Sequence, residues 1–204
     1  MFQSTWNLVT QNNKFSLDQV SPDKLPKGYE FAIINVDGHY NMAFLGKRVK
    51  SSSSQGEIVD EYWYSPTGEM IQLRNERLHL VFGLPTEWRN NQSAAPQWPD
   101  VLSKTSESRW VRTRDEMPNY RYGVQDSIVT RALTAPPNLD SKAKEIAPTS
   151  SESVRWVQDQ IETTAANGNR WAFQQLFALE QNRVVYSEQC VSSTFCLRIR
   201  KLKP

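Results

Sequence analysis

The chain has 204 residues, a length that suits one sizeable hydrophobic core and is short for two ordinary domains. Charged residues make up 23% of it and the formal net charge is +2. This balance argues against a dedicated nucleic-acid or membrane-surface protein, because such a protein has a strong basic excess. No apolar run approaches the roughly 20 residues that a membrane-spanning helix needs, and no charged segment followed by an apolar stretch marks a signal peptide. We therefore expect a cytosolic protein, or a secreted one whose targeting segment has been removed.

The N-terminal part of the chain predicts a short helix followed by a β-hairpin. Apolar residues around Trp6 would share one face of a helix over residues 2–12. From residue 28 onward the pattern has a period of two, and Asp37-Gly38 is a strong hairpin-turn signal. The Ser-rich segment 51–56 predicts a flexible connection to the next strand.

Residues 57–84 are the most informative stretch, because they predict antiparallel β-structure. β-branched and aromatic residues form two runs on either side of Pro66-Thr67-Gly68, which supplies the turn. The second run continues to residue 84. Adjacent side chains leave a strand on opposite sides, so Trp63 and its neighbours Tyr62 and Tyr64 can all be buried only if both faces of the sheet are covered.

The remainder of the chain predicts six more strands and two long loops. The strands are expected at residues 109–114, 120–133, 154–163, 170–179, 184–190 and 196–202. The loops are residues 88–108, with at most one helical turn around Trp98, and residues 135–153. About ten strands in sequential hairpins predict one mainly β domain over residues 1–204. We expect an antiparallel meander that forms a barrel-like structure or a two-layer sandwich, with the short N-terminal helix attached.

The two cysteines favour a disulfide. Cys190 and Cys196 are six positions apart, and β-prone runs flank them, so a hairpin would turn one toward the other. Such a bond implies an oxidising compartment. The alternative is a pair of reduced, half-buried thiols. Zinc binding is disfavoured, because two cysteines without a nearby histidine cannot complete a zinc shell.

No pattern of residues predicts catalysis, a metal site or a cofactor. His39 lies beside a turn and His79 inside a strand, and no nucleophile motif accompanies either. Asp60-Glu61 and Asp115-Glu116 have the residue types of a glycosidase pair, but neighbours on one strand point to opposite faces. We interpret these acids as solvated surface charge, while a pair assembled from different strands stays open. The chain also has no phosphate-cradling glycine loop.

Aromatic side chains are the best candidates for recognising a ligand. The candidates are Tyr62, Trp63, Tyr64, Trp110, Tyr120, Tyr122 and Trp171. Flat faces with a polar edge suit stacking on sugar rings, although core packing explains most of these positions. A scatter of basic residues is interpreted as a solvated face rather than as a surface that reads an anionic polymer. These residues are Arg109, Arg112, Arg114, Arg121, Arg198, Arg200 and Lys201.

Several stretches follow one another in a recognisable order over nearly the whole chain. They are STWNLV, DKLPKGYEFAIINVDG, YWYSPTGEMIQL, the Arg-Trp-x-Arg-Thr strand that begins at Arg109, NYRYGVQDSIVTRAL, FALEQNRVVYSEQ and LRIRKLK. In this succession the chain resembles the YjbF/GfcB-type outer-membrane lipoproteins, which are encoded with bacterial exopolysaccharide and group 4 capsule genes.

The resemblance implies an envelope protein with a signal peptide, a lipidated N-terminal cysteine and an outer-membrane anchor facing the periplasm. This sequence departs from that pattern because it begins MFQSTW without a lipobox, so the leader and the lipidated cysteine would have been removed. The implied function is a non-enzymatic accessory role in exopolysaccharide or capsule production and export. The expected partners are a polysaccharide or export-machinery proteins, with no nucleic acid, and with membrane contact through the lipid anchor alone. Alternatives are a lipid or lipoprotein carrier with an incomplete β-barrel, or a glycan hydrolase.

Overall fold

The computed structural model describes residues 17, 20, 25–53, 56–93, 95–104, 106–118, 120–148, 153–165, 168–192 and 195–202. Within them lie twelve strands: β1 (Phe31–Val36), β2 (His39–Ser53), β3 (Gly56–Tyr64), β4 (Met70–Arg74), β5 (Arg77–Phe82), β6 (Glu87–Ser93), β7 (Ser108–Met117), β8 (Arg121–Ala132), β9 (Arg155–Thr164), β10 (Arg170–Glu180), β11 (Arg183–Cys190) and β12 (Cys196–Leu202). Two helices accompany them, α2 (Trp98–Ser103) and α3 (Ser141–Ile146). The helix expected over residues 2–12 lies outside the described residues.

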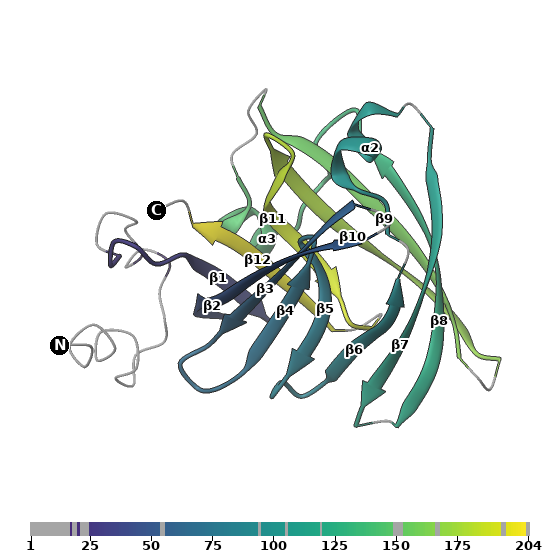
Figure 1. The fold of residues 1–204 in the computed structure, drawn as a ribbon, viewed down its shortest axis with the longest axis horizontal. Helices are drawn as coiled ribbons and strands as arrows, with labels where there is room; N and C mark the ends of the chain where they lie inside the picture. Colours follow the sequence, from purple (N-terminus) through teal and green to yellow (C-terminus); the bar gives the residue numbers. More distant parts are fainter. Residues whose placement is uncertain are drawn as a thin grey trace.

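The strands form a closed antiparallel barrel. Each strand pairs with its neighbour in the sequence, and β12 pairs with β1 to complete the ring (Figure 1). The prediction of a mainly β, antiparallel meander is confirmed, and of the two arrangements left open the chain adopts the barrel. Closure gives every strand a neighbour on both sides, so no long edge remains to pair with another molecule.

The structure has two strands more than the expected ten, because one expected strand is divided and one expected loop contains a strand. The run after the first turn breaks at Asn75-Glu76 into β4 and β5. Both turn residues have positive φ angles, 46° and 66°. A two-residue turn of this kind usually contains glycine, as Asp37-Gly38 does, so Glu76 carries no turn signal in the sequence.

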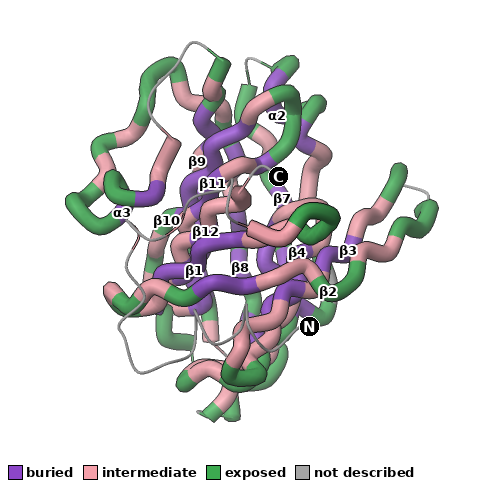
Figure 2. The backbone as a smooth tube through the Cα atoms, turned by 90° about the vertical axis from the view of Figure 1, so that its left-hand side faces the viewer, coloured by how far each residue is buried: buried purple, intermediate pink, exposed green. Residues whose placement is uncertain are grey.

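Three segments expected to be loops contain regular structure instead. Residues 51–53 and 56 belong to the β2–β3 hairpin, whose exposed outer part projects from the barrel in Figure 2. Residues 88–93 belong to β6, whose sequence is mostly polar. Of its inward residues Trp88 and Asn90, Trp88 is apolar and Asn90 is polar. Residues 135–153 contain α3, whose first turn is capped by the Asp140 carboxylate accepting a hydrogen bond from the Ala143 N–H at 2.7 Å.

The two helices cover different parts of the barrel. α2 lies at one end (Figure 1), where Trp98 and Val101 pack with Phe177 of β10. α3 lies on the outside (Figure 2), where Ile146 packs with Trp156 of β9 and other outward-facing side chains. Within the described part of the chain, no helix is both long and apolar enough to span a membrane.

A disulfide closes the last hairpin next to an apolar cluster. Cys190 and Cys196 are bonded, as predicted, and they face each other across β11 and β12. The loop between them contributes Val191 and Phe195 to the interior. This apolar cluster comprises Ala32, Ile34, Ala43, Trp63, Ile71, Leu73, Leu78, Val81, Trp88, Val191, Phe195, Leu197 and Ile199. It joins β1 to β6 with the β11–β12 loop across the inside of the barrel.

Candidate functional site

The barrel wall is weakest between β5 and β6. These strands pair at two positions, Leu80 with Arg89 and Val81 with Trp88. The first half of β5 stays paired with β4 but has no partner on β6, and the Leu78 N–H instead donates a hydrogen bond of 2.6 Å to Oε1 of Gln189 on β11. The start of β5 therefore separates from β6 and leaves an opening in the wall.

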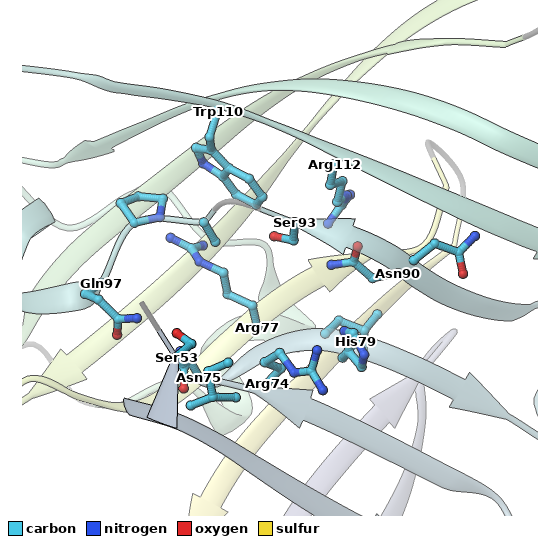
Figure 3. Close-up of a pocket in the computed structure, with 15 residues that line it drawn as sticks. Ser53, Arg74, Asn75, Arg77, His79, Asn90, Ser93, Gln97, Trp110 and Arg112 are labelled. Carbon is cyan, nitrogen blue, oxygen red and sulfur yellow. The ribbon is translucent and has the colours of Figure 1, made fainter. Parts of the chain in front are cut away.

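A polar pocket occupies this opening (Figure 3). Its cavity volume is about 120 Å³, and its walls come from the strands β2 to β7 and the segment before α2. The side chains that define its chemistry are Arg74, Arg77, His79, Asn90, Trp110 and Arg112. Figure 3 shows these residues arranged around one space. Among the described residues, the lining contains no aspartate or glutamate.

Arg77 is held in the pocket wall by an ion pair that crosses the barrel. Its Nη1 donates to Oδ2 of Asp159 on β9 at 2.5 Å, although β5 and β9 are not neighbouring strands. The guanidinium also lies 3.9 Å above the ring of Trp98, a cation–π arrangement. Thr130 completes the support, because it accepts a hydrogen bond from Trp110 Nε1 and donates one to Asp159. The Arg77 side chain is therefore positioned by contacts on several sides.

Arg112 enters the pocket from the opposite wall. Its Nε donates to Oδ2 of Asp126 at 2.6 Å, and its guanidinium lies 4.9 Å from the centre of the Trp88 ring. Arg114 donates to the same carboxylate oxygen at 2.8 Å, and the Thr163 hydroxyl donates to the other oxygen at 2.6 Å. Burial raises the pKa of Asp126, but the charges of Arg112 and Arg114 outweigh burial and hold it below its usual range.

Arg77 and Arg112 belong to a charged network made of two separate sets of ion pairs. One set is Arg77 with Asp159, and the other comprises Arg112, Arg114, Arg121, Asp126 and Glu116. The first set is balanced in charge, and the second extends away from the pocket to Arg121, whose side chain is 33% exposed. Burial lowers the pKa of Arg77, Asp159 opposes this effect, and the nearby charge of Arg112 adds to it. Two guanidinium groups, each paired with a carboxylate behind it, therefore line the pocket.

Four buried polar atoms of the pocket lining have no hydrogen-bond partner among the described residues. They are Nη2 of Arg77, Nη2 of Arg112, Oδ1 of Asn90 and Nδ1 of His79. Arg77, Asn90 and Arg112 are 7%, 8% and 3% exposed. An unpaired polar group at such burial costs free energy, so it usually has a partner. Four such atoms belong to residues that line one cavity, and this makes the cavity the candidate binding site.

His79 is neutral in this setting. Burial lowers its pKa to about 4, and the positive charges of Arg74 and Arg89 contribute, although Asp60 acts in the opposite sense. At neutral pH the imidazole therefore offers one donor nitrogen and one acceptor nitrogen to the pocket. In the described part of the chain, no group of three or more His, Cys, Asp or Glu residues could hold a metal ion.

The structure places the predicted aromatic residues in several different environments. Trp110 lines the pocket, and so does Arg112, which lies two residues further along β7. Trp63 points into the barrel and lines a second cavity, while Tyr62 and Tyr64 are half-buried on the other side of β3. The remaining three lie near the β7–β8 turn or on β10: Tyr120 and Tyr122 are exposed, and Trp171 lies under the guanidinium of Arg121 at 5.2 Å. The seven residues therefore do not form one surface.

The second cavity lies beside the apolar cluster. Its volume is about 250 Å³, and its walls are mainly apolar, with Ile34, Trp63, Ile71 and Leu84 among them. It contains neither of the pocket arginines. The two cavities thus differ in chemistry as well as in position.

The interpretation of the acids and arginines as solvated charge is wrong for several residues. Arg112 and Arg114 are buried, and so are Asp60, Glu61 and Glu116. On β7, Trp110, Arg112, Arg114 and Glu116 all face inward, because alternate residues of a strand share one face. If Trp110 is taken as a core residue, the alternation along β7 predicts that Arg112 also points inside the barrel. Arg77 and Asn90 carry no such signal, because their role depends on the opening between β5 and β6.

No protein-family model matches the chain, and no curated protein matches it by sequence. The fold is similar to that of the hypothetical lipoprotein YmcC from Escherichia coli, known from a crystal structure. The two chains are 14% identical, the similarity covers 100% of this chain and 96% of the other, and the TM-score is 0.63. At this level of identity the comparison establishes a shared fold.

Proposed function

We propose that the protein is a non-enzymatic accessory protein of exopolysaccharide or capsule production and export, and that it acts by binding glycan. The observation that carries this proposal is the pocket between β5 and β6, with its four unpaired polar atoms. Sugars present hydroxyl groups that both donate and accept hydrogen bonds, and the pocket offers both kinds of partner. The order of sequence motifs shared with the YjbF/GfcB-type lipoproteins supports the assignment to a polysaccharide pathway.

Binding fits the pocket better than hydrolysis does. Glycoside hydrolysis uses two carboxyl groups on either side of the scissile bond, about 5–9 Å apart. No described residue of the lining carries a carboxyl group, and the acids behind it are held in ion pairs with arginines. We therefore assign the pocket a recognition role.

The proposed location is the periplasm, with an outer-membrane lipid anchor in the native form. Two observations support this location: the disulfide between Cys190 and Cys196, which suits an oxidising compartment, and the fold similarity to a protein described as a lipoprotein. In this setting a protein of the export machinery is the second expected partner.

Calorimetric titration with oligosaccharides from the polysaccharide of the producing bacterium tests the proposal. We expect saturable binding that Trp110→Phe weakens, because Trp110 forms part of the pocket wall. Trp171→Phe is the matched control, because Trp171 lies away from the pocket and was an equal candidate from sequence. Absence of binding to every oligosaccharide would exclude the glycan-binding function and leave a role in contacting an export protein.

The second cavity favours one alternative, a lipid carrier. Its apolar walls beside Trp63 suit an acyl chain. The charged network fills the adjacent interior, so a chain could enter from one end and not pass through the barrel. Displacement of a fluorescent fatty acid tests this alternative: saturable binding that Ile71→Asn abolishes would establish it, and absence of binding would remove it.

A further inference from the structure

The pocket between β5 and β6 is lined by two positively charged groups and is incompletely hydrogen-bonded. Nη2 of Arg77 and Nη2 of Arg112 are two donors on positively charged groups, and both lack a partner among the described residues. The acids that pair with these arginines, Asp159 and Asp126, contact other atoms of the guanidinium groups. A neutral ligand would satisfy the donors, but only an anion would also be attracted by the charge of the two guanidinium groups.

An oxyanion would satisfy both requirements together. Charge-assisted hydrogen bonds from arginine to a carboxylate, sulfate or phosphate are about twice as strong as bonds between neutral groups. They are also screened less by salt at a buried site than at the surface. Arg77 and Arg112 belong to β5 and β7, so one oxyanion between them would connect these two strands across the pocket.

The remaining lining groups indicate what the oxyanion is attached to. Oδ1 of Asn90 is an acceptor, and the neutral His79 presents a second polar atom on the same side. An acceptor next to two cationic donors suits a hydroxyl group close to a carboxylate, as in a sugar acid. Trp110 adds a flat apolar wall of the kind that sugar rings contact.

The size of the cavity agrees with such a group. One water needs roughly 10–15 Å³ on a comparable measure. A volume of about 120 Å³ therefore accepts a carboxylate together with an adjoining part of a sugar ring, but not a long oligosaccharide. The rest of a polymer would extend outward through the opening.

We propose that this pocket binds the carboxylate of a uronic-acid-type sugar, with Arg77 and Arg112 on the carboxylate and Asn90 on a neighbouring hydroxyl. This proposal names the acidic unit of the glycan in the proposed function. It rests on that function, because it assumes that the carboxylate belongs to a sugar.

Titration of the protein with glucuronate, galacturonate, glucose and inorganic sulfate tests the inference. We expect the two sugar acids to bind and glucose to bind at least about 10-fold more weakly, because loss of a charge-assisted hydrogen bond changes affinity by roughly 10–100-fold. Sulfate should compete with the sugar acids, but with lower affinity, because it lacks the hydroxyl for Asn90. Equal affinity for glucose and glucuronate would overturn the inference, and so would absence of binding to both sugar acids.

Asn90→Asp is the most direct variant. It preserves the shape of the side chain and adds a negative charge to the lining that Asn90 shares with Arg77 and Arg112, so the protein itself would compete with a bound anion. We expect affinity for glucuronate to fall at least about 10-fold while thermal stability is unchanged or raised. Asn41→Asp is the matched control: it makes the same change in charge at an exposed position that lines the second cavity. An equal effect of both variants on affinity would contradict the inference.

Arg112→Lys provides a second variant in which the charge is retained but the bidentate geometry is lost. Its affinity for glucuronate should fall while its unfolding transition remains cooperative. The His79 resonances supply an independent readout, since a bound anion nearby should raise the pKa of His79 and glucose should not. If glucuronate binds but no oligosaccharide does, the pocket assignment stands and the polysaccharide function fails. If neutral and acidic oligosaccharides bind equally, the function stands and this inference fails.

Discussion

The apolar cluster and the charged network fill the same barrel by different means. The apolar cluster connects β1 to β6 with the β11–β12 loop through packed hydrocarbon and aromatic side chains. The charged network connects β5 with β9 and β7 with β8 through ion pairs, and each of its polar atoms needs a specific partner. Packing can be completed within the protein, whereas the network leaves two donors unpaired at the pocket. The contrast indicates that the apolar region stabilises the barrel and that the charged region provides the binding site.

Removing the central carboxylate of the charged network should have the largest effect. Asp126→Asn leaves Arg112 and Arg114 buried without their shared anion, so we expect the free energy of unfolding to fall by about 3–5 kcal/mol. Denaturant unfolding measures this loss. Glu107→Gln is the control, because Glu107 pairs with the exposed Arg109, and its loss should change stability by at most about 0.5 kcal/mol. If Asp126→Asn lost as little free energy of unfolding as Glu107→Gln, the charged network would contribute little to stability.

Acidification should weaken the charged side of the barrel before the apolar side. The folded-state pKa of His79 is lowered to about 4 from an ordinary 6.5, so the unfolded state binds more protons between these values. Stability should therefore be fully retained above pH 6.5 and fall as the pH approaches 4, by about 2–3 kcal/mol at pH 4. Asp60 and Glu61, whose pKa values lie below the ordinary range, contribute at lower pH.

Thermal unfolding measured from pH 7 to pH 4 checks this dependence. His79→Gln should flatten the stability profile in this window, and His39→Gln, at an exposed position of β2, should leave it unchanged. A wild-type profile that is flat between pH 6.5 and 4 would show that His79 is not neutralised by burial.

The smallest expected effect is on the apolar side. Replacing Cys190 and Cys196 by serine removes a cross-link that closes a short loop, which should cost about 2 kcal/mol in free energy of unfolding. Val191 and Phe195 should stay in the apolar cluster, because hydrocarbon packing holds them independently of the bond. Affinity for glucuronate should be unchanged in this variant; a loss of affinity would mean that the two regions are coupled.

Local patterns in the sequence were sufficient for most of the strands. Alternating side chains and the Asp37-Gly38 turn predicted the first hairpin, and the spacing of Cys190 and Cys196 predicted the disulfide. The division at Asn75-Glu76 was missed, because a glutamate with positive φ has no local signature. The strand β6 was also missed, because its composition is polar. The neighbouring strands, rather than the residues of β6 itself, determine that Asn90 faces inward.

The sequence by itself determined an antiparallel β-domain, its disulfide and several of its turns, because each of these depends on residues close together in the chain. The tertiary structure decided which charges are buried and where the pocket lies. Arg77 meets Asp159 across 82 positions, and Leu78 meets Gln189 across 111. Contacts at such separations arise when the barrel closes, and one of them takes up the Leu78 N–H beside the opening between β5 and β6.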